Sequence, residues 1–139
     1  MSVTQILAVD DSPAWERFVR GILESESDLK IIATSKDGLE AVQKAKGLQP
    51  DLVLMDFNLP GIDGLEVTRR IRMLSPTSKI LFLSGLRESD FIEAALRVGA
   101  LGYVWKPDSD SDLLTAIRVV LRGRQFVSRS LINWRESHG

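Results

Sequence analysis

Short apolar runs alternate with amphipathic segments along most of this chain, and several of the runs end abruptly at a polar residue. The runs lie at residues 6–9, 29–33, 52–55, 80–83 and 102–105. Between them, apolar residues recur every three or four positions, as they do in a helix that buries one face. Apolar strands separated by such helices indicate a parallel sheet covered on both faces. Because crossover connections are right-handed, we expect an α/β fold with a doubly wound, five-stranded parallel sheet.

The first helix has a clear start signal in the sequence. Ser12 is a good N-cap residue, and Pro13 suits the first helical turn that follows it. Trp15 and Phe18 lie on the apolar stripe of this helix, so we expect both side chains in the core.

The repeating pattern also predicts the extent of the domain. The segment 37–47 predicts a helix in which Leu39, Val42 and Ala45 face inward, and the last helix is expected at 109–122. The pattern breaks after Gly123. We therefore expect one domain at 1–123 and an appendage, rather than a sixth strand–helix unit, at 124–139.

Composition restricts the chemistry that is available. The chain has 139 residues, a net charge of -1, no cysteine and one histidine, His138. The absence of cysteine excludes thiol and disulfide chemistry, and a single histidine near the C-terminus argues against a histidine-based site. No basic field argues for direct contact with nucleic acid. No apolar run approaches the roughly 20 residues that span a bilayer, and the N-terminus lacks the features of a signal peptide. We expect a cytoplasmic protein that does not insert into a membrane.

Polar side chains follow four of the five predicted strands. Asp10 and Asp11 follow the first strand, Asp56 the third, Ser84 ends the fourth and Lys106 follows the fifth. In a doubly wound sheet, ligands bind at the carboxyl ends of the strands, so these side chains are expected at one edge. Crowded carboxylates repel one another unless a cation lies between them, and oxygen ligands without histidine or cysteine suit Mg²⁺.

The same residue types suit the transfer of a phosphoryl group. A carboxylate oxygen, here that of Asp56, can attack phosphorus and form an aspartyl-phosphate. A metal ion and Lys106 would stabilise the charge on the phosphoryl oxygens, and Ser84 can donate a hydrogen bond to one of them. The sequence therefore predicts a phosphoryl-acceptor site.

The ordered set Asp10-Asp11, Asp56, Ser84 and Lys106-Pro107 resembles the receiver domain of two-component response regulators, as does the loop 56–64. The resemblance covers roughly residues 4–123. It implies the flavodoxin-like receiver fold with strand order 2-1-3-4-5. It also implies a histidine kinase as the phosphoryl donor, and no enzymatic activity beyond self-catalysed phosphorylation and dephosphorylation.

The resemblance assigns a role to each residue of the set. Asp56 corresponds to the phosphoacceptor. The implied Mg²⁺ ligands are Asp10, Asp11, Asp56 and the backbone carbonyl of Asn58. Ser84 and Lys106 correspond to the pair that binds the phosphoryl group, and Ser84 and Tyr103 to the pair that switches conformation. The Lys106–Pro107 peptide bond is expected to be cis.

The spacing is closest to that of the NarL-like subfamily, whose receivers precede a DNA-binding helix-turn-helix. The segment 122–128 resembles the end of such receivers. This implies a transcription regulator that reaches DNA only through an output domain absent from this chain, with 124–139 as a linker stub. A stand-alone receiver stays open, as does a homodimer formed through the receiver.

Two other functions use some of the same residue types. A magnesium-dependent phosphohydrolase of the haloacid-dehalogenase type carries a second acid two residues after its nucleophile. Here Ser12 follows Asp10 at that spacing, and Asn58 follows Asp56. A degenerate receiver that serves only as an interaction module is the other alternative, although all the site residues are present.

Overall fold

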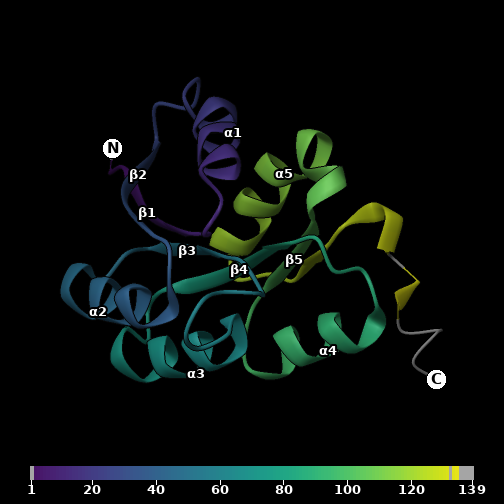
Figure 1. Cartoon of the computed structure of the whole chain (residues 1–139). Coiled ribbons are helices and arrows are strands. Elements are labelled where there is room, and N and C mark those ends of the chain that lie inside the picture. Colours follow the sequence, from purple (N-terminus) through teal and green to yellow (C-terminus); the bar gives the residue numbers. More distant parts are fainter. Residues whose placement is uncertain (1, 132, 135–139) are drawn as a thin grey trace.

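Parallel strands form one sheet in the computed structural model, which describes residues 2–131 and 133–134 (Figure 1). Within those residues the sheet has six strands in the order β2-β1-β3-β4-β5-β6. The strands are β1 Thr4–Val9, β2 Leu29–Ser35, β3 Leu52–Met55, β4 Lys79–Ser84, β5 Gly102–Trp105 and β6 Phe126–Val127. The predicted order of the first five strands is confirmed, and a short sixth strand extends it.

Helices cover both faces of the sheet. They are α1 Pro13–Leu23, α2 Gly38–Leu48, α3 Gly64–Leu74, α4 Ser89–Arg97 and α5 Ser109–Leu121. In Figure 1, α1 and α5 lie on one face, and α2, α3 and α4 lie on the other. No helix among the described residues is both long and apolar enough to cross a membrane.

Alternate residues of each central strand enter different cores. In β1, Leu7 and Val9 pack with residues of α2, α3 and α4, whereas Ile6 packs with residues of α1 and α5. In β3, Met55 and Leu54 divide in the same way. Because successive side chains of a strand point to opposite faces, a strand between two helical layers must be apolar throughout.

The first helix begins as predicted, and the inward face of the second contains Val42 and Ala45 as predicted but not Leu39. Ser12 caps α1 by accepting a hydrogen bond from the Trp15 N–H at 3.4 Å. Leu39 was expected to face inward, yet it is 53% exposed. The inward face of α2 is made by Ala41, Val42 and Ala45, because smaller side chains let this helix lie close to α3 and the sheet.

The expectation of a cis bond before Pro107 is wrong, because the Lys106–Pro107 bond is trans. Residues Lys106–Asp108 form a 3₁₀ turn, η1, that leads directly into α5. The Lys106 carbonyl accepts hydrogen bonds from both the N–H and the hydroxyl of Ser109. Before proline, the trans isomer is lower in free energy than the cis isomer by about 0.5–1 kcal/mol. In this turn the Lys106 carbonyl is hydrogen-bonded with the peptide bond in the trans form.

The expected appendage is packed against the sheet over residues 126–131. Phe126 and Val127 pair with β5 in parallel register. The Ser128 N–H donates to the Tyr103 carbonyl at 2.9 Å, and Ser128 Oγ accepts from the Trp105 N–H at 2.8 Å. Leu131 lies in the 3₁₀ helix η2 (Arg129–Leu131) and is 6% exposed within the core cluster under α4.

Part of the expected appendage lies outside the residues that the structure describes. Residues 135–139, which include His138, lie outside it, as does residue 132. The boundary predicted after Gly123 falls before β6, so the segment placed outside the domain supplies the edge strand of its sheet.

Truncation of Leu131 tests whether this segment belongs to the folding unit. Leu131→Ala is expected to lower the free energy of unfolding by about 2–3 kcal/mol, since it removes a buried side chain and leaves a cavity. The matched control is Met73→Ala on α3, whose side chain is 73% exposed and whose removal should change little. Urea unfolding measures both values, and equal midpoints for the two variants would contradict the docking of this segment.

Candidate functional site

Three carboxylates meet where β1 and β3 end. Asp10 and Asp11 follow β1, and Asp56 follows β3, which pairs with β1 so that Val9 lies opposite Met55. Each acid offers one oxygen, and the three oxygens lie within 4.8 Å of one another. The parallel register brings together side chains that are far apart in the sequence, as the prediction of a common edge required.

Two of these carboxylates are oriented by backbone N–H groups. Asp10 Oδ1 accepts a hydrogen bond from the Ser12 N–H at 2.8 Å, and Asp56 Oδ1 accepts one from the Phe57 N–H at 2.8 Å. These bonds fix one oxygen of each side chain and direct the other oxygen, Oδ2, toward Lys106.

Lys106 is the cation of the cluster. Its Nζ lies 2.8 Å from Asp10 Oδ2 and 3.7 Å from Asp56 Oδ2. The side chains are shielded from water, with 13% of Lys106, 14% of Asp10 and 11% of Asp56 exposed. Ion pairs with so little solvent contact are stronger than surface pairs, but their partners lose more hydration.

The environment of Asp56 opposes its ionisation. Burial raises the pKa of Asp56 to about 6, and the negative charge of Asp10 adds to the rise. Lys106 and the hydrogen bond from the Phe57 N–H act in the opposite direction but do not cancel it. One lysine therefore compensates only part of the repulsion, so this cluster suits an additional cation.

Ser84 and Tyr103 meet at one short loop beside the cluster. Ser84 is 1% exposed, and its Oγ accepts a hydrogen bond from the Leu86 N–H at 3.1 Å. Tyr103 is fully buried and its hydroxyl donates to the Leu86 carbonyl at 2.7 Å, while burial raises the pKa of Tyr103 to about 12. Both predicted switch residues thus hold the same residue of the β4–α4 loop.

The loop after Asp56 turns back beneath it. Asn58 is exposed in this loop, and its proposed carbonyl ligand stays a prediction. At Gly64 the chain returns so close that an added Cβ would lie 2.3 Å from the Asp56 carbonyl oxygen. The glycine lets α3 start directly under the acceptor, where the Gly64 N–H donates to the Phe57 carbonyl at 2.8 Å.

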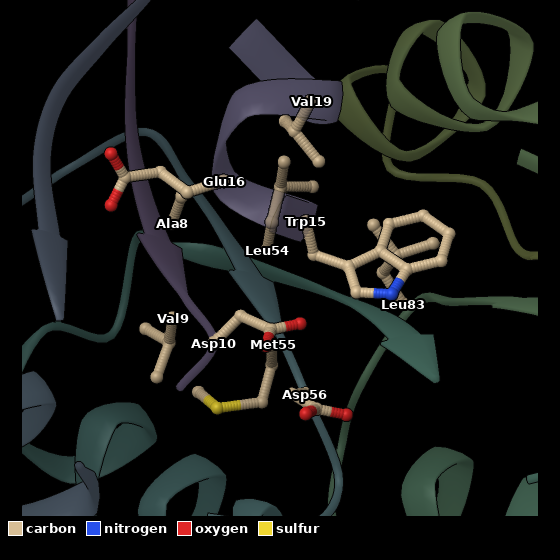
Figure 2. Close-up of a pocket in the computed structure, with 10 residues that line it drawn as sticks. All are labelled: Ala8, Val9, Asp10, Trp15, Glu16, Val19, Leu54, Met55, Asp56 and Leu83. Carbon is tan, nitrogen blue, oxygen red and sulfur yellow. The ribbon is translucent and has the colours of Figure 1, made fainter. Parts of the chain in front are cut away.

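Trp15 also belongs to the site, although the sequence pattern did not predict this. We expected it in the core, but it is half-buried and its ring centroid lies 4.8 Å from Lys106 Nζ. It also lines a cavity of about 20 Å³ beside Asp10 and Asp56, with Leu83 on the same wall (Figure 2). Its place three residues after the N-cap, in the first turn of the helix that follows the acids, is the signal that could have revealed it.

A doubly wound parallel sheet with an acid cluster and a lysine at its carboxyl edge defines a class, and comparisons with known proteins identify it. The family model of the response regulator receiver domain matches residues 6–118. The chain is also 37% identical over 128 residues to the oxygen regulatory protein NreC of Staphylococcus aureus. That match covers 91% of this chain and 59% of NreC, so the chain spans only part of this relative's length.

Solved structures agree with this family. A LuxR-family two-component response regulator from Aurantimonas sp. SI85-9A1 is 33% identical, with 99% of each chain covered and a TM-score of 0.92. The signal receiver domain of NarL from Mycobacterium tuberculosis is 25% identical, with 89% of this chain and 100% of that chain covered and a TM-score of 0.83. The chain therefore belongs to the response regulator receiver domain family, and to its NarL/LuxR type; a haloacid-dehalogenase-type phosphohydrolase is not favoured.

Neutralising the acceptor is expected to stabilise the metal-free protein. In Mg²⁺-free buffer at pH 7, Asp56→Asn should raise the free energy of unfolding by about 1–2 kcal/mol. The folded-state pKa of about 6 lies above the ordinary value of 3.8. The unfolded chain therefore loses its proton first, and the wild type loses stability as the pH rises from about 4 to about 6.

The measurement is urea unfolding of both proteins at pH 4 and at pH 7, with Asp110→Asn as an exposed control on α5. The advantage of Asp56→Asn should be smaller at pH 4, where folded Asp56 is protonated and the unfolded carboxyl is only partly ionised. An equal advantage at both pH values would show that its source is not the charge of Asp56.

Proposed function

We propose that this chain accepts a phosphoryl group on Asp56, with Mg²⁺ bound beside it and a histidine kinase as the natural donor. The observation that carries the proposal is the meeting of the shielded Asp10, Asp56 and Lys106 with the exposed Asp11 in one cluster at the carboxyl edge of the sheet. Membership of the receiver domain family supports it.

The chemistry of the donor set fits Mg²⁺. Asp10, Asp11 and Asp56, together with the backbone carbonyl of Asn58, would hold the ion, since carboxylate oxygens lie close enough to share it. When bound, Mg²⁺ would offset the charge of the carboxylates and of the phosphoryl oxygens.

Asp56 supplies the nucleophile. A carboxylate oxygen of Asp56 forms a bond to phosphorus while the bond from phosphorus to the donor's imidazole nitrogen breaks. The electron pair of the broken bond stays on the imidazole, which takes up a proton from solvent. Lys106 lies 3.7 Å from Asp56 Oδ2, so its ammonium group can hold charge on the transferred oxygens.

Ser84 and Tyr103 provide a route by which the modification changes the shape of the domain. The Ser84 hydroxyl can donate to a phosphoryl oxygen while its Oγ still accepts from the Leu86 N–H. A shift of Ser84 would then move Leu86, whose carbonyl holds the Tyr103 hydroxyl. Because Tyr103 is already buried, we expect the change in the loop 85–88 rather than an entry of Tyr103 from solvent.

We further propose that the chain is the input part of a transcription regulator. The match to NreC supports this, because the chain spans only 59% of the length of that relative. Contact with DNA would then belong to an output domain outside this sequence. A homodimer formed through the receiver stays a prediction.

Phosphorylation by a small donor tests the acceptor. With Mg²⁺ and acetyl phosphate, the intact mass of the protein should rise by one phosphoryl group, and a chelator should prevent the change. Asp56→Asn should abolish the modification, whereas Asp110→Asn should retain it. A stable phosphoprotein in the Asp56→Asn variant would refute the assignment, and steady hydrolysis of a phosphomonoester would favour the phosphohydrolase alternative instead.

Removal of the lysine is expected to tighten metal binding. Lys106 pairs with Asp10 at 2.8 Å, so Mg²⁺ must compete with an ammonium group for this carboxylate. Lys106→Met should lower the dissociation constant for Mg²⁺ by about tenfold, because a positive charge near the ion is lost. Calorimetric titration measures the constant, with the exposed Lys46→Met on α2 as the control. Weaker binding in Lys106→Met would contradict the proposed competition.

A further inference from the structure

We propose that Trp15 is a positioning residue for Lys106: its indole face keeps the ammonium group beside Asp56 when Mg²⁺ engages Asp10. This inference rests on the proposed phosphoryl-acceptor function and adds a residue to it. Trp15 would thereby favour the transfer step, in which an Asp56 oxygen bonds to phosphorus and the leaving group departs with its electron pair.

The position of the Trp15 ring is tied to the acid cluster by local hydrogen bonds. Asp10 Oδ1 accepts from the Ser12 N–H at 2.8 Å, and Ser12 Oγ accepts from the Trp15 N–H at 3.4 Å. Phe18, one turn further along α1, packs edge-on against the ring with centroids 5.0 Å apart. The indole is therefore held in a fixed place relative to Asp10.

Lys106 has three neighbouring groups, and two of them, Asp10 and Asp56, also belong to the proposed metal site. Its Nζ lies 2.8 Å from Asp10 Oδ2, 3.7 Å from Asp56 Oδ2 and 4.8 Å from the centroid of the Trp15 ring. An Asp10 carboxylate that binds a divalent cation attracts the ammonium less, and the cation itself repels it. The Trp15 ring is not a metal ligand, so it remains a partner of the ammonium group when the metal is bound.

The surroundings make this contact stronger than a typical surface contact. The Lys106 side chain is only 13% exposed, and cation–π attraction grows when the cation loses water. The ring also walls a cavity of about 20 Å³ together with Val19, Leu54 and Leu83 (Figure 2). Glu16, the next residue, directs its carboxylate away from Asp10 and Asp56 in this view, so it does not replace the ring.

Graded substitutions of Trp15 test the proposal through the rate of phosphorylation by acetyl phosphate at saturating Mg²⁺. Trp15→Leu, which keeps apolar bulk but removes the π face, should be slower by roughly five- to tenfold. Trp15→Phe should lie between Trp15→Leu and the wild type. Phe126→Leu, an aromatic substitution in β6 opposite Gly102 at the start of β5 and therefore away from the acid cluster, should react at nearly the wild-type rate.

A double-mutant cycle separates positioning from a general effect on the fold. If Trp15 acts through Lys106, Trp15→Leu should have no further effect on the rate in a Lys106→Met background. Urea unfolding of each variant checks folding, and Trp15→Phe serves if Trp15→Leu is too unstable.

A spectroscopic measurement tests the contact without any reaction. The chain has three tryptophans, so a variant with Trp105→Phe and Trp134→Phe reports fluorescence from Trp15 alone. Adding Lys106→Met should change the emission of Trp15, and adding Lys46→Met should not. The change should persist in the presence of Mg²⁺, because the ammonium is expected to stay on the ring.

The outcomes are distinguishable. A wild-type rate for Trp15→Leu, or a loss that simply adds to that of Lys106→Met, would overturn the positioning role while the acceptor function stands. If wild-type protein is not phosphorylated on Asp56 at all, the proposed function fails and the role of Trp15 in transfer fails with it. If Lys106→Met leaves the emission of Trp15 unchanged, the contact between Trp15 and Lys106 is ruled out.

Discussion

Repulsion among three carboxylates, compensated by a single ammonium group, is the constraint on which the rest of this domain depends. Lys106 touches Asp10 more closely than Asp56, and burial raises the pKa of Asp56 to about 6. An arrangement of this kind is unfavourable for a protein that only needs to fold, because unpaired buried charge lowers stability. It is favourable for a protein whose acid cluster binds a cation and then gains further negative charge on one of its members.

The fold supplies the rigidity that keeps such a cluster together. β1 and β3 lie side by side at the centre of the sheet, each buried on both faces, so Asp10 and Asp56 cannot move apart without disturbing two cores. Backbone N–H groups fix one oxygen of each carboxylate, and Gly64 permits α3 to start directly beneath Asp56. The repulsion is therefore confined to side chains that are anchored at the ends of two strands buried on both faces.

The sequence predicts the elements with strong local signals and misses those that depend on tertiary contacts. Apolar runs gave the five central strands and their polar ends, which brought Asp10, Asp56 and Lys106 to one edge as expected. β6 has only two residues, and its pairing with β5 leaves no periodic pattern to recognise. The apolar stripe of α1 predicts Trp15 in the core. The same spacing occurs when an aromatic ring also contacts an ammonium group, so the pattern cannot distinguish the two cases. Leu39 was misplaced because α2 packs through Ala41 and Ala45 instead.

The missed β6 strand also bears on how a signal could leave the site. Ser84 holds Leu86, Leu86 holds the Tyr103 hydroxyl, and the backbone of Tyr103 and Trp105 holds Ser128. These contacts form a continuous path from the edge of the acid cluster to the C-terminal segment, where a longer regulator would continue. Ser128 and Leu131 are buried, so a displacement of β5 would have to move the segment or expose its side chains. The segment expected as an appendage is thus joined to β5 by hydrogen bonds, and under the proposed function it is well placed to respond to phosphorylation of Asp56.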